Sequence, residues 1–485
     1  MTPSLKDPSL FRQQAYIDGA WTDADSGATI PVDNPASGNV FGHVPLMGKA
    51  ETKRAIGAAA AAFPAWRATP AKIRATILRR WADLVAAHVD DLALLMTTEQ
   101  GKVLAEAKGE IATSSAYLEW SGEEAKRSYG DTIPTTFTDK RLLVVKEPIG
   151  VVAAITPWNF PSSMIARKAG PAIAAGCTVV LKPSELTPFS AMALAALAER
   201  AGLPKGVFNV VTGDAVAIGE ELTSSPIVRK LGFTGSTPVG KLLMAQCAGT
   251  VKKISLELGG NAPFIVFDDA DLEAAVEGAI TSKFRNAGQT CVCANRIYVQ
   301  DGIYDAFTAK LAEAVAKLKI GHGTEADATH GPLINVKSLE KVERHIQDAL
   351  SKGAKLVTGG KRHALGGNFF ELTVLRDVTP AMAVAKEETF GPLAPLFRFK
   401  NEEDAVKLAN DTEYGLAAYF YGRDIGRVWR VAEALEYGMV GINTGIITTE
   451  VAPFGGVKES GIGREGSKYA LDEFMEIKYL CMGGL

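Results

Sequence analysis

The stretch Gly150-Val151-Val152-Ala153-Ala154-Ile155-Thr156-Pro157-Trp158-Asn159-Phe160-Pro161 decides the fold class of this chain. Its first six residues are continuously apolar, which predicts a strand buried on both faces of a parallel sheet. The two prolines that bracket Trp158 and Asn159 predict a rigid loop at the carboxyl end of that strand. Ligands of doubly wound sheets bind beyond the carboxyl ends of the strands, so this loop is a candidate ligand-binding loop.

Asn159 is the polar residue of that loop, and the residues alone leave two interpretations open. Its side-chain amide could donate a hydrogen bond to an oxyanion that develops on a substrate. It could equally cap the helix that is predicted to begin near Ser162.

Further strands, each ended by a polar or Gly-containing loop, follow this first one. The predicted strands and their loops are 177–181 with Lys182-Pro183-Ser184-Glu185, 206–211 with Thr212-Gly213-Asp214, and 228–233 with Thr234-Gly235-Ser236-Thr237. Predicted helices separate them, and this alternation indicates a parallel sheet with right-handed crossovers. The sequence therefore predicts a Rossmann-like α/β domain whose loops gather at one edge.

The stretch Gly235-Ser236-Thr237-Pro238-Val239-Gly240-Lys241-Leu242 resembles a P-loop but departs from it. Leu242 replaces the hydroxyl that binds magnesium, and Pro238 lacks a backbone N–H, so ATP binding is not expected. Ser236 at a helix N-terminus still suits the pyrophosphate of a dinucleotide. The usual GxGxxG fingerprint does not occur in these strand–loop–helix units.

Glu257 and Cys291 are the residues best suited to catalysis. Glu257 stands between two leucines beside Gly259-Gly260, and a carboxylate among apolar neighbours can have the raised pKa of a general base. The alternative is a strand-edge Glu that faces water. Cys291 follows the turn Gly288-Gln289-Thr290 and precedes a predicted strand, which suits a reachable nucleophile. The alternative is that Cys291 and Cys293 are small buried hydrophobic residues.

The composition limits the function classes. The chain has 485 residues, 47% hydrophobic and 22% charged, with a net charge of −3. No basic field favours nucleic acid or an anionic membrane, and neither a signal peptide nor a membrane-spanning run is found. The five scattered cysteines favour a reducing compartment, the cytoplasm, over a disulfide framework. The sequence contains neither an HExxH motif nor paired CxxC motifs, so no metal site is expected.

Outside this region, patterns predict a short hairpin arm at 16–21, a mostly helical region from 49 to about 129, and a strand at 141–147. A second α/β unit is predicted from 263 to about 443, with a helix at 271–286 that leads into the cysteine turn. The chain is expected to end in an amphipathic helix and a strand over about 465–479, which form an arm.

Six motifs, in this order, resemble the NAD(P)-dependent aldehyde dehydrogenase superfamily over the whole length of the chain. They are Thr156-Pro157-Trp158-Asn159-Phe160-Pro161, Lys182-Pro183-Ser184-Glu185, Phe233-Thr234-Gly235-Ser236, Glu257-Leu258-Gly259-Gly260, Gly288-Gln289-Thr290-Cys291 and Glu388-Thr389-Phe390-Gly391-Pro392. The resemblance implies a cofactor-binding domain (1–126 and 147–256), a catalytic domain (257–445), and an oligomerisation arm with a C-terminal segment (127–146 and 446–485).

The resemblance also implies roles for individual residues. Cys291 would be the nucleophile, Glu257 the general base, and the Asn159 side chain with the Cys291 backbone N–H the oxyanion hole. NAD or NADP, without a metal, would be held by Thr156, Pro157, Trp158, Lys182, Ser184, Glu185, Gly213, Gly235, Ser236, Glu388 and Phe390. A retained Cys291, Asn159 and Glu257 argue against a non-catalytic binding or structural protein.

Within the superfamily the chain most closely resembles succinate-semialdehyde dehydrogenases. Arg167 and Arg285 would grip the carboxylate of the aldehyde, beside Thr448; the alternative is that each arginine pairs with a protein acid. Glutarate semialdehyde, one methylene longer, competes as the substrate, because a methylene gives only about 1–3 kcal/mol of discrimination; a broad-range aldehyde dehydrogenase is the further alternative.

Three further expectations follow from the resemblance. Glu185 favours NAD slightly over NADP, because a carboxylate repels a 2′-phosphate. Cys293 is either a redox partner of Cys291 or a packing residue. The protein is expected to be a homodimer or homotetramer.

Overall fold

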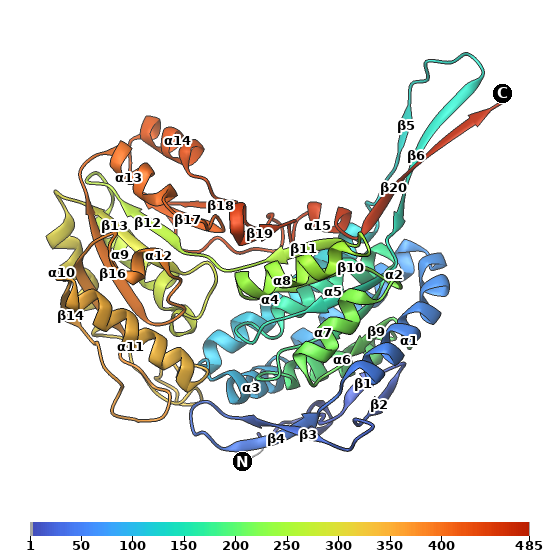
Figure 1. The fold of residues 1–485 in the computed structure, drawn as a ribbon, viewed down its shortest axis with the longest axis horizontal. Helices are drawn as coiled ribbons and strands as arrows, with labels where there is room; N and C mark the ends of the chain where they lie inside the picture. The colour runs from blue at the N-terminus through green and yellow to red at the C-terminus, as the bar shows by residue number, and fades with distance from the viewer. Residues whose placement is uncertain (1–2, 485) are drawn as a thin grey trace.

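The computed structural model describes residues 3–484, and two large sheets dominate this part of the chain (Figure 1). The first sheet has the strand order β19-β11-β10-β7-β8-β9-β1-β2. The bounds are β19 (Gly461–Ile462), β11 (Lys253–Glu257), β10 (Val228–Thr234), β7 (Val151–Ile155), β8 (Thr178–Lys182), β9 (Phe208–Val210), β1 (Ala15–Ile17) and β2 (Ala20–Thr22). Strands β11, β10, β7, β8 and β9 are parallel, and antiparallel strands close both edges.

Helices cover both faces of this sheet, as right-handed crossovers require. They are α1 (Lys49–Ala68), α2 (Ala71–Ala87), α3 (Val89–Gln100), α4 (Leu104–Ala125), α5 (Ser163–Ala175), α6 (Phe189–Ala201), α7 (Ala215–Ser224) and α8 (Thr237–Ala248). Alternate residues of β7 divide between two cores: Val152 and Ala154 pack with α2, α4, α5 and α6, whereas Val151 and Ala153 pack with α1, α7 and α8. The apolar run at 150–155 therefore contains the buried parallel strand that the sequence predicts.

The second large sheet has the order β14-β15-β16-β13-β12-β17-β18. Its strands are β14 (Lys355–Thr358), β15 (Thr373–Val378), β16 (Leu393–Phe399), β13 (Ala294–Gln300), β12 (Ala262–Val266), β17 (Ala417–Tyr421) and β18 (Met439–Ile442). Its helices are α9 (Leu272–Phe284), α10 (Tyr304–Val315), α11 (Val336–Ser351), α12 (Ala383–Lys386), α13 (Glu402–Asn410) and α14 (Ile425–Ala434). Glu257 ends a strand of the first sheet and Ala262 starts a strand of the second, so the catalytic candidates lie where the two sheets meet.

A smaller three-stranded sheet projects from the body as an arm (Figure 1). It consists of β20 (Met475–Gly483), β6 (Lys140–Pro148) and β5 (Asp131–Ile133), in the order β20-β6-β5. A two-stranded sheet joins β3 (Thr29–Asp33) to β4 (Val40–Pro45). Short elements complete the chain: η1 (Pro8–Leu10), η2 (Arg285–Gly288), η3 (Lys458–Ser460) and α15 (Tyr469–Asp472).

The α/β architecture is confirmed, and three local expectations need correction. The hairpin β1–β2 is not an arm, because Tyr16 pairs with Val210 of the first sheet. The expected final helix is only the single turn α15, and the strand after it extends to Gly483. The helix expected to reach Asn286 ends at Phe284, because Asn286 adopts a left-handed conformation with φ 52°.

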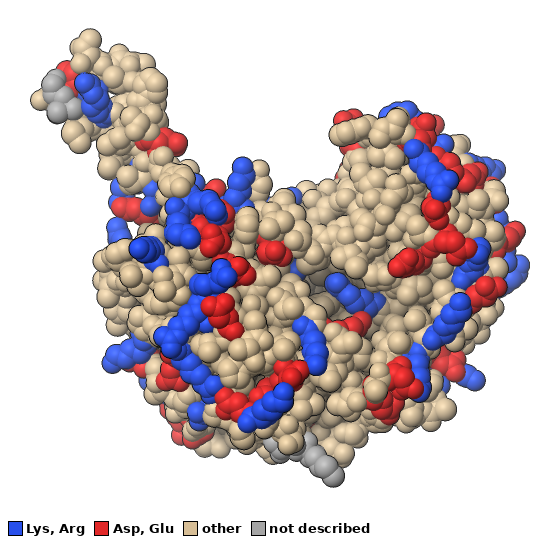
Figure 2. Space-filling model, turned by 180° about the vertical axis from the view of Figure 1, so that it is seen from behind, with Lys and Arg blue, Asp and Glu red and all other residues tan. Residues whose placement is uncertain are grey.

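The surface has no single dominant charge on the face seen in Figure 2, where acidic and basic side chains are interspersed. Among residues 3–484, no helix is both long enough and apolar enough to cross a membrane.

Candidate active site

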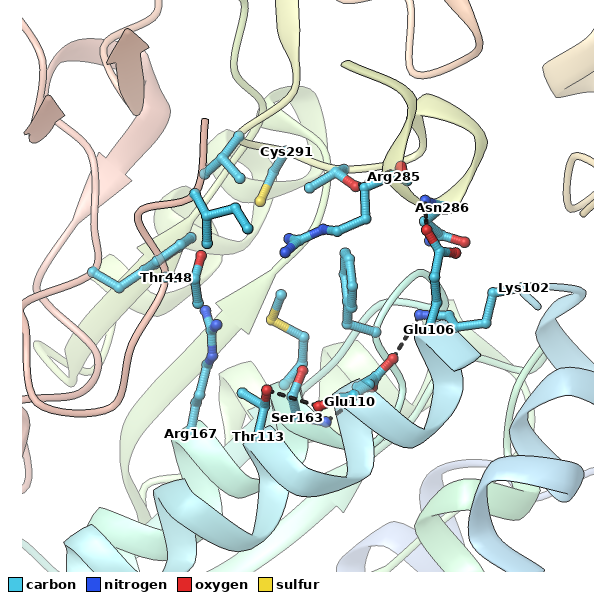
Figure 3. Close-up of a pocket in the computed structure, with 17 residues that line it drawn as sticks. Lys102, Glu106, Glu110, Thr113, Ser163, Arg167, Arg285, Asn286, Cys291 and Thr448 are labelled. Atoms are coloured by element: carbon cyan, nitrogen blue, oxygen red, sulfur yellow. Dashed lines mark hydrogen bonds and ion pairs between the residues drawn. The ribbon is translucent and has the colours of Figure 1, made fainter. Parts of the chain in front are cut away.

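Two cavities meet at Cys291. The first, which we call the arginine cavity, has a volume of about 300 Å³ and contains Arg167 and Arg285 (Figure 3). The second, which we call the strand-edge cavity, has a volume of about 370 Å³ and lies beyond the ends of β10 and β11. Cys291 and Met164 line both. A sulfur atom at the junction can therefore contact ligands from either side.

The loop that carries Cys291 is held rigidly by its neighbours. Gly288 has φ 76°, and a Cβ there would lie 2.1 Å from the carbonyl oxygen of Gly391, so this position requires glycine. The buried Gln289 side chain donates to the Asn286 carbonyl at 3.0 Å and accepts from the Ile334 N–H at 2.9 Å. The turn predicted from Gly288-Gln289-Thr290 is thus a fixed support for the thiol.

The Cys291 thiol is partly buried, and this burial dominates its protonation. Burial raises the pKa of the thiol to about 12, the charges of Glu388 and Glu257 add to this increase, and Arg167 opposes it. Without a ligand, the thiol is therefore protonated at neutral pH, and its proton must go to a base when the sulfur attacks.

Asn159 lies directly beside this loop. Its Nδ2 donates to the Gln289 carbonyl at 3.1 Å, which leaves the second N–H of the amide for a ligand. Its own backbone carbonyl accepts hydrogen bonds from Lys102 Nζ at 2.8 Å and from Asn286 Nδ2 at 3.0 Å. The side chain does not cap α5.

The cap of α5 comes instead from α4. Glu110 Oε1 accepts from the N–H groups of Ser162 and Ser163 at 2.9 and 3.1 Å. The Asn159 side chain is therefore not needed as a helix cap, and its amide is available to donate a hydrogen bond to an oxyanion.

Glu257, the last residue of β11, is buried and lines the strand-edge cavity. Burial, and secondly the charge of Glu465, raises the pKa of its carboxyl well above the usual value, while Lys168, Arg167 and Arg464 oppose this increase. Its Oε2 has no hydrogen-bond partner. The alternative of a water-facing strand-edge carboxylate is excluded, and the raised pKa suits a general base.

Arg167 and Arg285 enter the arginine cavity from different elements (Figure 3). The Arg167 guanidinium, on α5, stacks on the rings of Tyr117 and Phe454, with its centre 4.7 and 4.4 Å from the two ring centres. Its Nη1 lies 3.8 Å from Glu465 Oε2, and its Nε and Nη1 are buried without a hydrogen-bond partner. Two rings thus pack against the guanidinium, and its unpartnered Nε and Nη1 remain available to an anion.

Arg285 lies in η2 and has no salt-bridge partner among residues 3–484. Its guanidinium centre is 5.2 Å from the Phe160 ring centre. Thr448 lines the same cavity. Arg285 therefore does not pair with a protein acid among the described residues. Arg167 has only a long contact, at 3.8 Å, with Glu465.

The strand-edge cavity has the features expected of a dinucleotide site. Pro157, Trp158, Gly235, Ser236, Glu388 and Phe390 line it. The hydroxyl of Ser236 does not cap α8, and the buried Thr234 Oγ1 has no partner, so polar groups at this helix N-terminus are available to a ligand. An N-terminus with free donors suits a pyrophosphate, so these residues fit the cofactor that the sequence indicates.

Glu388 and Phe390 form the far wall of that cavity. Glu388 Oε1 accepts from the Gly260 N–H at 3.1 Å, and burial raises the pKa of Glu388 to about 7. The Phe390 ring packs edge-on against Trp158, with 5.5 Å between the ring centres. These residues connect the loop after β7 to the second sheet.

The remaining predicted cofactor residues lie at the strand ends beside the cavity or farther away. Lys182 Nζ and Glu185 Oε2 form an ion pair at 2.8 Å, and the Lys182 carbonyl accepts from the Thr156 N–H at 3.1 Å. Ser184 lies in the same loop, and its Oγ accepts from the Leu186 N–H. Gly213 does not line either cavity, and its backbone packs against Met47 instead.

Cys293 is fully buried and lies outside both cavities. Its Sγ donates to the carbonyl oxygen of Lys283 at 2.9 Å. The thiol is thus engaged by the end of α9, and the loop would have to move before this sulfur could meet that of Cys291.

Several cavity residues were not predicted from the sequence. Lys337, Ser338 and Lys341, from α11, line the strand-edge cavity. The strongly alternating polar and apolar faces of 336–351 were a signal for an amphipathic helix, but not for what its polar face contacts. Lys168 and Glu465, an ion pair beside Glu257, come from segments 297 residues apart.

Comparison with known proteins gives the family. Residues 21–480 match the sequence model of the Aldehyde dehydrogenase family. The chain is 69% identical over 481 residues to glutarate-semialdehyde dehydrogenase of Pseudomonas aeruginosa, covering 99% of this chain and 100% of that protein. It is 67% identical over 479 residues to succinate-semialdehyde dehydrogenase [NADP(+)] GabD of Escherichia coli, covering 99% of each.

The solved structures agree with the sequence relatives. The crystal structure of succinate-semialdehyde dehydrogenase from Burkholderia pseudomallei is 70% identical and superposes with a TM-score of 0.99, over 99% of this chain and 100% of that one. A family match over most of the chain, relatives at this identity and the site around Cys291 agree: the chain belongs to the aldehyde dehydrogenase family.

Proposed function

We propose that this aldehyde dehydrogenase oxidises succinate semialdehyde to succinate with NAD or NADP. One observation carries the proposal: two guanidinium groups, without a hydrogen-bonded acid partner, line the cavity that contains the Cys291 thiol. Two arginines in this cavity select an aldehyde whose other end is a carboxylate, because a planar guanidinium matches a carboxylate in shape and charge.

The residues around Cys291 support a covalent route. The thiolate adds to the aldehyde carbon to give a thiohemiacetal, while the Asn159 amide and the Cys291 backbone N–H donate to the oxygen. The bound nicotinamide supplies the hydride acceptor. Glu257 then takes a proton from the water that attacks the resulting thioester, and the acid is released. The Thr234 to Ser236 turn, Lys182 with Glu185, and Glu388 with Phe390 are the proposed contacts of the cofactor.

Glutarate semialdehyde is the second candidate substrate. Thr448 stands at the wall of the arginine cavity, and a relative that is 69% identical bears the name glutarate-semialdehyde dehydrogenase. A second relative, 67% identical, is named as NADP-dependent, so both dinucleotides belong in the assay.

The test is steady-state NAD(P)H formation with succinate semialdehyde, glutarate semialdehyde and butanal, each with NAD and with NADP. The same assays are run on Arg167→Ala and Arg285→Ala. We expect each arginine variant to lose at least about 100-fold in kcat/KM for the semialdehydes, because removing one partner of a buried charge pair typically costs this much. Each variant should retain butanal oxidation. A wild-type preference for butanal would contradict the carboxylate proposal and leave the family intact.

We also propose that Cys293 can act as a resolving thiol for Cys291. A peroxide would oxidise Cys291 to a sulfenic acid, and the Cys293 thiol would displace water to form the disulfide. The buried contact of Cys293 with Lys283 implies slow closure. Peroxide inactivation that dithiothreitol reverses in the wild type but not in Cys293→Ser would support the proposal; equal behaviour of the two proteins would refute it.

A further inference from the structure

The two arginines of the cavity are held very differently. Arg167 is held by the rings of Tyr117 and Phe454, and Glu465 lies 3.8 Å from its Nη1. Arg285 contacts one ring, that of Phe160, at 5.2 Å, and has no acid at salt-bridge distance among the described residues. Moving Arg167 would break two cation–π contacts and an ion pair. To move Arg285, at most one such contact is lost.

A small cavity lies next to the arginine cavity, and Arg285 lines both. Ser282, Tyr419, Gly445 and Ile447 line it. The wall that it shares with the arginine cavity consists of Arg285, Thr290, Val292, Ile446 and Thr448. Its volume is about 10 Å³, close to the limit for one water molecule. A space that can hold about one water molecule gives the neighbouring Arg285 side chain room for a small displacement, and a substrate one methylene longer requires only a small displacement of the group that binds its carboxylate.

We propose that Arg285 is the adjustable arm of the carboxylate clamp, and that it withdraws into this small cavity to admit a substrate one carbon longer. Arg167 is the fixed arm and keeps its place for both substrates. The chain then oxidises both four-carbon and five-carbon semialdehydes with a single site. The inference rests on the proposed function, and it assigns chain-length tolerance to the space that Ser282 borders.

Ser282 is a suitable position for the test because it touches neither cavity that meets Cys291. It lies in the last turn of α9, and its Oγ makes only a weak contact, 3.5 Å, with the Ala279 carbonyl. Ser282→Thr keeps the hydroxyl and adds one methyl group to the small cavity. Ser282→Ala removes the hydroxyl and enlarges that cavity.

Arg167 offers a matched control. A cavity of about 10 Å³ also lies behind Arg167, and Ser121 lines it. Ser121→Thr therefore adds the same methyl group behind the fixed arm. If only Arg285 moves, filling the space behind Arg167 changes nothing in the choice between the two substrates.

The experiment measures kcat/KM for glutarate and succinate semialdehyde, and for pentanal and butanal, in the wild type and the three variants. We expect Ser282→Thr to lower the glutarate-to-succinate ratio about 10-fold or more, the value of a methylene in a confined site. Ser282→Ala should leave that ratio equal or higher. Ser121→Thr should leave it unchanged, and the pentanal-to-butanal ratio should not change in any variant.

Different failures have different meanings. If no protein prefers a semialdehyde over the uncharged aldehydes, the proposed function fails. If the semialdehydes are preferred but Ser282→Thr leaves their ratio unchanged, or Ser121→Thr shifts it equally, the proposal that Arg285 adjusts to the longer substrate is wrong. A structure with bound glutarate provides a second readout that does not depend on variants: the Arg285 guanidinium must lie closer to Ser282 than with bound succinate. An unmoved Arg285 would overturn the inference.

Discussion

Glu257 and Glu465 are both buried, and each has one carboxylate oxygen without a hydrogen-bond partner. Glu465 forms an ion pair with Lys168, yet its charge still helps to raise the pKa of Glu257. The carboxyl of Glu257 is therefore held between a neighbouring negative charge and the cations Lys168, Arg167 and Arg464. Burial and the negative charge of Glu465 raise the pKa of Glu257, and the three cations oppose this increase, so the carboxylate is a stronger base than an exposed glutamate.

This balance predicts a pH dependence for thioester hydrolysis. Only the carboxylate form of Glu257 can activate water, so the hydrolysis rate should rise with pH until pH exceeds the raised pKa. The thiol pKa of Cys291 does not contribute, because the sulfur is acylated at this stage. In Glu257→Gln we expect the first turnover of NAD(P)H to remain, and steady-state kcat to fall about 10²–10⁴-fold and lose its rising limb.

The measurement is a rapid-mixing burst followed by the steady state, from pH 6 to 10. Asp268→Asn, on the loop after β12, is the control for a carboxylate outside the site and should keep the wild-type profile. A rising limb that persists in Glu257→Gln would show that another group is the base.

Lys182 and Glu185 should govern the choice between NAD and NADP. Burial raises the pKa of Glu185, but the charge and hydrogen bond of Lys182 outweigh this and lower it, so Glu185 is ionised at neutral pH. A 2′-phosphate beside this carboxylate is repelled, whereas Lys182 attracts it. Glu185→Gln should therefore raise kcat/KM for NADP relative to NAD about 10-fold, the effect of about 1.4 kcal/mol.

Glu199→Gln is the control, because it removes a negative charge from an exposed position on α6. It should leave the ratio of kcat/KM for NADP and NAD unchanged. An unaltered ratio in Glu185→Gln would show that this carboxylate does not face the 2′ position.

At the scale of elements, α4 holds the amino end of α5 in place. Glu110 accepts the N–H groups of Ser162 and Ser163, and its other oxygen pairs with Lys102 Nζ at 2.6 Å. Lys102 also donates to the Asn159 carbonyl. Both side chains are only 1% exposed. This buried pair thus connects the packing of α4 against α5 to the position of Asn159.

Breaking this pair should be costly. Glu110→Gln leaves the Lys102 charge buried and weakens the cap of α5, so we expect a loss of about 3–5 kcal/mol in the free energy of unfolding. The double variant Lys102→Met/Glu110→Leu should recover part of this stability, because no unpaired charge remains, yet keep a reduced kcat because Asn159 loses a donor. Urea denaturation followed by activity assays measures both.

A surface pair provides the control for this prediction. Glu123→Gln breaks an exposed contact with Lys126 and should cost no more than about 1 kcal/mol. Equal stability of Glu110→Gln and Glu123→Gln would show that the buried pair does not anchor α5.

The elements also show which features sequence patterns reveal. The strand at 151–155 was predictable because burial on both faces requires an unbroken apolar run. The cap of α5 by Glu110 was not, because its partners are 52 and 53 residues away and a lone Glu in a helix looks like any solvated Glu. Likewise, Cys291 and Glu257 stand in recognisable local contexts, whereas the role of Glu465 depends on tertiary contacts with Lys168 and Arg167. Local periodicity predicts which residues are buried, but it does not predict which distant residues interact.

At the scale of the whole molecule, the arm carries apolar side chains on both of its faces. Ile477 and Tyr479 are 73% and 55% exposed and point to one face of β20, while Leu480 and Met482 are 40% and 50% exposed and point to the other. A projecting strand of this kind is an aggregation hazard unless another chain covers it. This exposure supports the proposal of a homodimer or homotetramer that the arm holds together.

The last prediction separates the two faces of the arm. Ile477→Lys/Tyr479→Lys places two charges on one face, and Leu480→Lys/Met482→Lys places two on the other. Burying an unpaired charge in an interface costs several kcal/mol, so at least one double variant should have a lower molar mass by size exclusion with light scattering. If each variant reduces the mass to a different extent, each face has its own contact, as in a tetramer. Wild-type mass in both, with unchanged circular dichroism, would show that the arm is not an interface.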